Sequence, residues 1–358
     1  MGAFFMGVYY DKILGSFIGA AAGDALGAIT ETYSIDKINA VYGGPVREFR
    51  KPPMDNNAQT NECGQVTDDF SIAYYLLQSI VANGEITRRA VEEALIEWYK
   101  PGVYYNKFAG ATTKASIEAL LGNPPKLMPG TVVVHTNRAT NGASMKIFPC
   151  GLLHPGEVDR AIDDAVIACL PTHDNDIAIS GAAAVAAAVS VAMTPHPTLK
   201  EVMQAGLYGA REGEKRGAEA SRSIAGARVL RRMELAIELV MRAHSPEEAL
   251  RELSEVLGSG LQISEAVPAA FGVLLIYGGD PMESLFGGVN IGNDTDSIAT
   301  VVGAITGAWH GWEVYPEHYL PLLDKANRFD LRALARELEE VVLKNEPEKA
   351  MAGGRAPR

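Results

Sequence analysis

Two short acidic segments of this chain have the residue types and spacing of a binding site for hard cations. The segments are Thr67-Asp68-Asp69 and Asp294-Thr295-Asp296-Ser297. Neighbouring carboxylates repel each other, so burying them without a cation is costly. Carboxylate and hydroxyl oxygens suit Mg²⁺, Ca²⁺ or Mn²⁺, and the carboxylates of both segments together could neutralise two divalent ions. Neither segment contains histidine, which disfavours a zinc site.

Each acidic segment also has a simpler interpretation as the start of a helix. Thr67 could be an N-cap with Asp68 and Asp69 in the first turn, where the helix dipole favours anions. Asp294 or Thr295 could cap the apolar run that follows the second segment. For either segment alone, capping is the better interpretation. Two such segments, each directly before a strongly apolar helix, favour a shared metal site at helix termini.

Three other stretches carry candidate functional residues, each with a structural alternative. Glu31 lies near the end of a predicted helix, where a negative charge opposes the dipole, so a functional carboxylate competes with an ordinary surface glutamate. In "TNGASMKIFPCGLL", Asn141-Gly142 favours a turn, and the backbone N–H groups from Gly142 to Ser144 could cradle phosphate. His173, in "LPTHDNDIAIS", could contact a ligand or cap a helix, and a structural role is usual for a single histidine.

Helices must position most of these residues. Apolar residues recur at helical spacing from Asp11 to Ala28 and from Asp68 to Ala82. The segment 177–192 is rich in alanine and apolar on every side, so we expect it to be buried on every side. Further helices are predicted at 87–98 (with Thr87 as N-cap), 158–169, 199–211, 220–242, 246–256, 263–276, 280–288, 296–309, 317–326 and 330–344.

Strand signals are scarce. The best candidate is "TVVVHT" (131–136), and it could equally be a short extended loop segment. The pattern therefore predicts an all-α protein with a single compact multi-helix domain over residues 8–344. A long loop rich in Pro and Gly is expected at 122–151, and a disordered tail at 345–358.

The composition limits the classes of partner. The chain has 358 residues and a formal net charge of -12, and an acidic surface repels nucleic-acid backbones, so no nucleic-acid partner is expected. Charged residues interrupt the apolar N-terminal run before it could span a membrane. Three cysteines without a CxxC pair favour a reducing cytoplasm. One basic cluster is interpreted as a solvated helix face: Arg222, Arg228, Arg231 and Arg232.

Five segments, taken in chain order, resemble the motifs of the ADP-ribosylglycohydrolase family, which includes the dinitrogenase reductase-activating glycohydrolases. They are "GDALGAITE", "GQVTDDF", "NGASMKIFP", "PTHDND" and "GNDTDSIA", which span roughly residues 11 to 312. The two acidic segments, in that order, are the most specific part of the resemblance. It implies an all-α fold with two Mg²⁺ or Mn²⁺ ions in a central cleft.

The resemblance also implies a role for each candidate residue. The metal ligands would be Thr67, Asp68, Asp69, Asp294, Asp296 and Ser297, with Asp296 as the bridge between the ions. The catalytic residues would be Glu31, Asp69 and Asp296, with Glu31 as the acid/base or substrate-gating carboxylate near the anomeric carbon. The substrate-binding residues would be Asn141, Gly142 and Ser144 in a diphosphate-binding loop, His173 near the nucleotide end, and Asn293.

Departures from the family pattern surround the expected leaving group and diphosphate. Asn293 stands where the family commonly has glycine, and Lys146 where it typically has arginine. The leading hypothesis is metal-dependent hydrolysis of an N-glycosidic bond at ribose C1, which removes ADP-ribose from a modified, arginine-type side chain of a protein. The runner-up is a hydrolase of a small nucleoside or other riboside with the same metal core. A third hypothesis, a non-catalytic ligand-binding or structural protein, is opposed by the six intact ligand positions.

Overall fold

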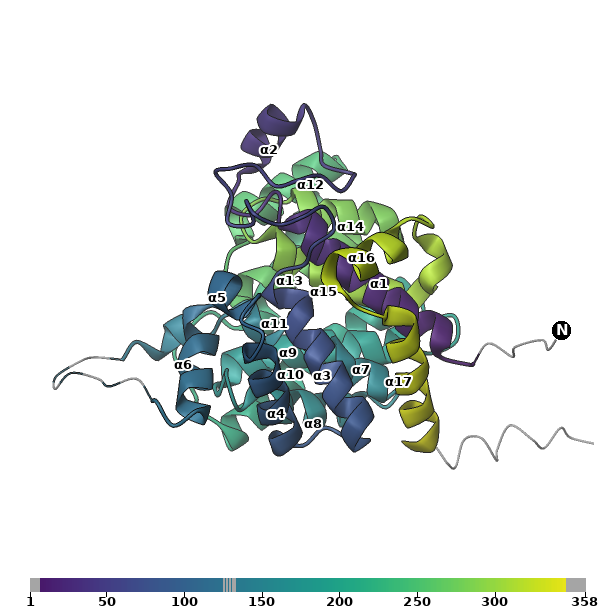
Figure 1. The fold of residues 1–358 in the computed structure, drawn as a ribbon. Coiled ribbons are helices and arrows are strands. Elements are labelled where there is room, and N and C mark those ends of the chain that lie inside the picture. Colours follow the sequence, from purple (N-terminus) through teal and green to yellow (C-terminus); the bar gives the residue numbers. More distant parts are fainter. Residues whose placement is uncertain (1–6, 125, 127, 129, 131–132, 346–358) are drawn as a thin grey trace, which may run out of the picture.

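The protein is built from helices around one core (Figure 1). The computed structural model describes residues 7–124, 126, 128, 130 and 133–345, and no β-strand occurs among them. The helices up to residue 192 are α1 (Tyr10–Gly27), α2 (Ile35–Tyr42), α3 (Asp68–Asn83), α4 (Arg88–Tyr99), α5 (Tyr105–Phe108), α6 (Ala111–Leu120), η1 (His135–Arg138), η2 (Asn141–Ala143), α7 (Phe148–Leu153), α8 (Val158–Cys169) and α9 (Asp176–Ala192). The later helices are α10 (Leu199–Ala220), α11 (Val229–Arg242), α12 (Pro246–Glu252), η3 (Leu253–Leu257), α13 (Ile263–Ile276), α14 (Pro281–Asn290), α15 (Thr295–His310), η4 (Trp312–Val314), α16 (Tyr319–Asn327) and α17 (Leu331–Asn345).

The predicted all-α class and single compact domain are confirmed. Several helices begin and end close to the predicted positions, and α8 and α13 match them at both ends. Thr87 caps α4 as expected, because its hydroxyl accepts a hydrogen bond from Ala90 N at 3.1 Å.

Helices α1 and α15 lie in backbone contact along most of their length. Glycines make this possible, because a Cβ at Gly19 would overlap the carbonyl oxygen of Gly303, and one at Gly303 would overlap that of Gly19. At the far end of α1, a Cβ at Gly27 would overlap the Cα of Asp296. The α1–α15 contact therefore sets the position of the acidic start of α15.

The alanine-rich helix α9 forms the centre of the core, as the sequence predicted. All of its residues except Val191 are buried, and α10 packs closely against it because Gly209 has no side chain to meet Ala183 and Ala187. Lys12 of α1 closes the end of this core, since its Nζ donates to Ala192 O (2.8 Å) and Trp309 O (2.8 Å). These carbonyls end α9 and α15, where a cation is favourable.

Some predicted boundaries are wrong. The helices α2, α5, α6 and α7 are short and were not predicted. Helix α7 begins at Phe148, inside the segment 122–151 that was expected to be a long loop. Helix α10 continues beyond 211 to Ala220, whereas 221–228 is a loop and not the start of a helix. In "TVVVHT", residues 133–134 are irregular and His135 starts η1, while 131–132 lie outside the described residues. Of the tail predicted to be disordered, Asn345 ends α17 and the rest also lies outside them.

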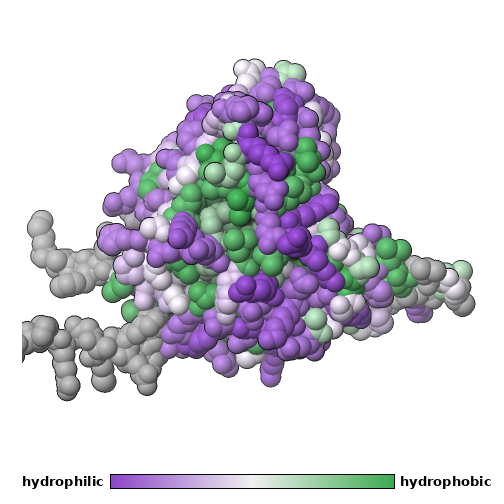
Figure 2. All heavy atoms as spheres, turned by 180° about the vertical axis from the view of Figure 1, so that it is seen from behind, coloured by the Kyte–Doolittle hydropathy of each residue, from purple (hydrophilic) through white to green (hydrophobic). Residues whose placement is uncertain are grey.

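The surface is largely polar. Seen from behind, it is hydrophilic around the periphery, and hydrophobic side chains gather in the middle of that face (Figure 2). Among the residues described, none of the helices combines the length and hydropathy needed to cross a bilayer.

Gly303→Ala should lower the free energy of unfolding by about 3 kcal/mol, because the added methyl group forces α1 and α15 apart. Gly110→Ala is the control, since it adds the same methyl group where nothing lies within 4 Å, and it should change stability by less than about 1 kcal/mol. Urea denaturation followed by circular dichroism measures both. Equal free energies of unfolding for the two variants would show that the close contact between α1 and α15 does not contribute to stability.

Candidate active site

The two acidic segments meet at one cavity, where two helices begin. α3 starts directly after Thr67, and α15 starts directly after Asp294. The cavity measures about 190 Å³, and Glu31, just after α1, also reaches it. It is lined by Glu31, Asp68, Asp69, Phe108, Gly110, Ala111, Thr112, Thr113, Asn137, Thr140, Asn141, Gly142, Met145, Leu261, Asp294, Asp296 and Ser297. The structure thus brings together the carboxylates of both segments and Glu31.

Asp24 of α1 holds the start of α3 in place. Its buried carboxylate accepts hydrogen bonds from Thr67 N (2.8 Å) and Phe70 N (2.8 Å), which are free donors at the helix start. Thr67 is the N-cap, as the capping interpretation predicted, and its hydroxyl accepts a hydrogen bond from Asp69 N at 3.3 Å. Capping and a shared acidic cavity therefore occur together at α3.

The start of α15 is held by α1 and by the loop after it. Thr295 Oγ1 donates to Gly27 O (2.9 Å), and Thr30 Oγ1 donates to Thr295 Oγ1 (3.0 Å). Asp294 is the N-cap residue, but its side chain makes no capping hydrogen bond and instead accepts one from Asn141 Nδ2 at 2.9 Å. The carboxylate of Asp294 is thereby directed to the cavity rather than to its own helix.

The carboxylates around the cavity repel one another strongly. Burial, and then the neighbouring carboxylates, raise the pKa of Asp68, Asp69 and Asp296 well above the usual range. Burial raises the pKa of Glu31 to about 7, and nearby carboxylates add to this effect. Burial also raises the pKa of Asp24 to about 7, although its hydrogen bonds from backbone N–H groups act in the opposite direction.

Two carboxylate oxygens in this cluster have no partner. Within the described part of the chain, Asp69 Oδ2 and Asp296 Oδ1 are buried and accept no hydrogen bond. Buried polar atoms are normally satisfied, so these oxygens require protons or cations. No group of three or more His, Cys, Asp or Glu among the described residues is arranged so that it could hold a metal ion as it stands. The donors present, carboxylate and hydroxyl oxygens, fit a hard divalent cation in their chemistry.

The loop that carries Glu31 is bonded to the segment before α15. Thr32 N donates to Asn293 O (2.7 Å), and Asn293 N donates to Tyr33 O (2.8 Å). Thr32 and Asn293 both have left-handed backbone conformations, with φ of 68° and 65°. Asparagine tolerates this conformation and threonine does not favour it. The side chain of Asn293 is exposed and does not line the cavity.

The segment 140–145 forms another wall of the cavity. Asn141 and Gly142 line it, whereas Ser144 is buried beneath them and its hydroxyl donates to Asn141 O at 2.9 Å. His173 is buried behind the wall, where a Cβ at Gly142 would lie 3.1 Å from its Cε1 and Nε2. Of the predicted substrate-binding residues, two reach the cavity directly.

Sequence reasoning missed one whole side of the cavity. Residues from the start of α6 and the loop before it line it, including Phe108 and Gly110 to Thr113, as do Asn137 and Leu261. Their sequence contains no motif of charged or metal-ligating side chains. Asp24 was missed too, and the available signal was its place beside Gly23 and Gly27 in the apolar run 11–28.

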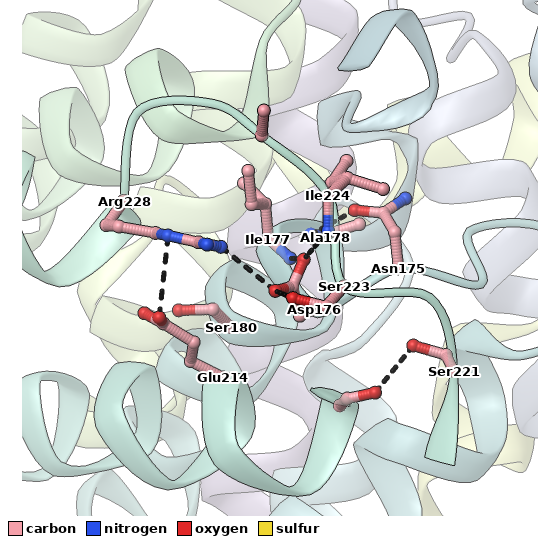
Figure 3. A network of polar contacts seen from close by, with 12 residues as sticks. Asn175, Asp176, Ile177, Ala178, Ser180, Glu214, Ser221, Ser223, Ile224 and Arg228 are labelled. Carbon is pink, nitrogen blue, oxygen red and sulfur yellow. Dashed lines mark hydrogen bonds and ion pairs between the residues drawn. The ribbon is translucent and has the colours of Figure 1, made fainter. Parts of the chain in front are cut away.

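The basic cluster is a helix face only in part: Arg231 and Arg232 lie in α11, whereas Arg222 and Arg228 belong to the loop 221–228 beside the start of α9 (Figure 3). Buried Asp176 accepts hydrogen bonds from Ser223 Oγ (2.9 Å), Ile224 N (3.1 Å) and Arg228 Nη1 (3.0 Å). The basic residues of the cluster are paired with acidic ones. The pairs are Arg222–Asp174, Arg228–Glu214, Arg231–Glu234 and Arg232–Glu265.

This loop braces the wall of the cavity. Thr136 Oγ1 donates to Ala225 O (2.7 Å), and Asn175 Nδ2 donates to Arg138 O (3.3 Å). Both bonds fix η1, whose Asn137 lines the cavity. The loop 221–228 and Asn175, the N-cap of α9, therefore support the wall that carries Asn137.

The chain belongs to the ADP-ribosylglycohydrolase family, whose sequence model matches residues 7–348. The protein is thus a hydrolase, and the resemblance seen in its motifs is confirmed. Members of this family in general depend on divalent metals, which agrees with the oxygen donors of the cavity.

Individual relatives cover nearly the whole chain. The uncharacterized protein YegU of Escherichia coli (strain K12) is 30% identical over 332 residues, 92% of this chain and 96% of its own length. The ADP-ribosylarginine hydrolase Tri1 of Serratia proteamaculans (strain 568) is 24% identical and covers 89% of this chain and 76% of its own. A solved structure, an ADP-ribosylglycohydrolase-related protein complex, shares the fold with a TM-score of 0.65 at 21% identity, over 93% of this chain and 99% of that one.

The stability of the metal-free protein should fall as the pH rises from about 4 to about 7. The pKa values of Asp24 and Glu31 rise from near 4 to about 7 on folding, so the folded state binds more protons than the unfolded state in that range. Deprotonation therefore destabilises the fold, on the order of 4 kcal/mol for Asp24 alone. Urea denaturation at several pH values, in EDTA and in Mg²⁺, measures this. Mg²⁺ should flatten the decline, and a metal-free stability that rises with pH would contradict the account.

Proposed function

We propose that the protein uses divalent cations to hydrolyse the N-glycosidic bond at ribose C1, and so releases ADP-ribose from a modified, arginine-type side chain. The observation that carries this proposal is the pair of buried, unpartnered oxygens, Asp69 Oδ2 and Asp296 Oδ1, in one cavity with Glu31. The name of the relative Tri1, an ADP-ribosylarginine hydrolase, supports arginine as the modified residue.

Oxygen atoms from both helix starts would hold two Mg²⁺ or Mn²⁺ ions. When bound, such ions supply positive charge that binds vicinal ribose hydroxyls and lowers the pKa of a water molecule. The proposed ligands are Thr67, Asp68, Asp69, Asp294, Asp296 and Ser297, with Asp296 between the two ions. The least direct of them is Thr67, whose side chain caps α3 and does not line the cavity.

Glu31 is the proposed acid/base. Burial raises the pKa of Glu31 to about 7 in the metal-free site, and a carboxyl shifted in this direction can hold a proton in one step and release it in another. Asn57 Nδ2 donates to Glu31 Oε1 at 3.1 Å and orients the group. Cleavage at C1 passes through an oxocarbenium-like state, whose positive charge the carboxylates of Glu31, Asp69 and Asp296 stabilise.

The remaining predicted residues are proposed to bind the substrate directly or through neighbours. Asn141 and Gly142 line the cavity and are placed to contact the diphosphate. Ser144 acts through its hydrogen bond to Asn141 O, and His173 acts from behind Gly142. Asn293 acts through its two backbone hydrogen bonds to the loop that carries Glu31.

The small size of the cavity supports a second candidate function, the hydrolysis of a small nucleoside or other riboside. At about 190 Å³ the cavity is smaller than the roughly 300–1,000 Å³ of pockets that enclose drug-sized ligands. A small riboside would use the same cation ligands and Glu31. The substrate classes are therefore an ADP-ribosylated protein first and a free small riboside second.

We place the protein in the cytoplasm on the evidence of its thiols. Cys63, Cys150 and Cys169 are all free, and two of them are buried. Unpaired cysteines are typical of a reducing compartment.

With Mg²⁺, the wild-type protein should release ADP-ribose from ADP-ribosyl-arginine, and Asp296→Asn should lower kcat by about 100-fold or more. Asp163→Asn is the control, because it neutralises an exposed carboxylate outside the cavity and should leave kcat unchanged. Chromatography of the released nucleotide measures the rate, with a panel of nucleosides assayed in parallel. Cleavage of nucleosides alone would favour hydrolysis of a small riboside. The absence of ADP-ribose release at every Mg²⁺ or Mn²⁺ concentration would contradict the proposed release of ADP-ribose.

A further inference from the structure

A line of buried polar side chains connects Lys146 with the wall of the cavity. Lys146 Nζ donates to Thr172 Oγ1 (2.7 Å), and Thr172 Oγ1 lies 2.8 Å from His173 Nδ1. His173 Nε2 lies 2.9 Å from Thr140 Oγ1. Lys146, Thr172 and His173 are almost inaccessible to solvent, whereas Thr140 lines the cavity. The roles proposed above leave Lys146, Thr172 and Thr140 unexplained.

Each hydrogen bond in this line has its donor on the side of Lys146 and its acceptor on the side of Thr140. Burial lowers the pKa of Lys146 to about 8, so its ammonium form prevails at neutral pH. An ammonium group has three donors and no acceptor, so Thr172 accepts from Lys146. The hydroxyl hydrogen of Thr172 then has His173 Nδ1 as its acceptor. The opposite direction would leave that hydrogen buried without an acceptor among the described residues.

The direction of the hydrogen bond between His173 and Thr140 follows from the one between Thr172 and His173. Burial, and then the nearby Lys146, hold the pKa of His173 well below its usual range, so the ring is neutral and has one N–H. With Nδ1 as an acceptor, the proton is on Nε2, which donates to Thr140 Oγ1. The hydroxyl hydrogen of Thr140 remains free, because within the described residues His173 is the sole hydrogen-bond partner of this hydroxyl.

We propose that Thr140 is a ligand-binding residue whose hydroxyl donates into the cavity to an acceptor oxygen of the substrate. Lys146, Thr172 and His173 are positioning residues that fix the direction of this donor. The identity of the ligand rests on the proposed function, on which the acceptor is a phosphate oxygen of ADP-ribose.

Lys146 makes this wall different in charge from the rest of the cavity. The charged residues that line the cavity are all acidic: Glu31, Asp68, Asp69, Asp294 and Asp296. Lys146 supplies a buried positive charge behind Thr140, and it is connected to the cavity only through uncharged groups. A phosphate oxygen at Thr140 would therefore face a donor backed by a cation.

The surrounding backbone fixes Thr140 at one end of the line and Thr172 and His173 in its middle. Thr140 pairs with Gln262 in an isolated antiparallel bridge, and Asn141 N donates to Leu261 O at 2.9 Å. Thr172 and His173 directly precede α9, whose first turn is held by the Asp176 network (Figure 3). The donor at Thr140 is thus preorganised before a ligand arrives.

The proton on His173 tests the direction without any ligand. In protein labelled with ¹⁵N-histidine, long-range ¹H–¹⁵N correlation spectra distinguish the two ring nitrogens, and His173→Gln assigns the signal. We expect Nε2 to be protonated and Nδ1 unprotonated, with no titration between pH 6 and 9. A proton on Nδ1 would mean that Thr140 donates to His173 instead, which overturns the proposal.

Binding of ADP-ribose in the presence of Mg²⁺ tests the donor itself by calorimetry. Thr140→Val removes the hydroxyl at constant shape and should raise Kd about tenfold, whereas Thr140→Ser keeps the hydroxyl and should bind within about threefold of the wild type. Thermal unfolding checks that both variants are folded. A Thr140→Val protein that binds as tightly as the wild type overturns the proposal. If the wild type binds no ADP-ribose, the proposed function fails, and the position of the His173 proton alone decides the direction of the line.

Discussion

The backbone contact between α1 and α15 is the constraint on which the rest of the site depends. Glycines on both helices remove the side chains that would separate them, so Gly27 lies directly against Asp296. This contact fixes the start of α15 relative to the end of α1, where Glu31 follows within one short turn. Asp24 lies on the same helix, and its carboxylate fixes the start of α3 by accepting hydrogen bonds from the backbone N–H groups of Thr67 and Phe70. One helix therefore positions both acidic segments and the proposed acid/base.

This arrangement concentrates negative charge in a buried place. Helix N-termini favour anions, which explains why the carboxylates are tolerated there, but the helix dipole is a weak effect beside the repulsion between several buried carboxylates. Burial, and then this repulsion, raise the pKa of Asp69 and Asp296, and one oxygen of each lacks a hydrogen-bond partner among the described residues. Divalent cations would offset this repulsion and would also supply the charge that sugar chemistry requires. The same carboxylates thus lower the stability of the metal-free fold and provide the ligands for the proposed cations.

Much of the fold followed from sequence periodicity, and the failures have physical causes. Residues 263–276 are mostly apolar, and the helix α13 begins and ends at the predicted residues. Residues 221–228 were predicted as part of a helix at 220–242, but they form a loop in which Arg228 and Ile224 N donate hydrogen bonds to buried Asp176. The acidic clusters were visible because their chemistry is local. The role of Thr140 was not visible, because its hydroxyl gains a role only through Lys146, Thr172 and His173 in the folded chain.

The central claim is that cations occupy the cavity between the starts of α3 and α15. Anomalous diffraction from crystals grown with Mn²⁺ tests it most directly, because manganese is located without reference to the protein density. The account predicts two strong anomalous peaks within coordination distance of Asp69 Oδ2 and Asp296 Oδ1, the two oxygens that lack partners. Well-ordered crystals with no anomalous peak in this cavity, or with manganese bound only at surface carboxylates, would contradict it.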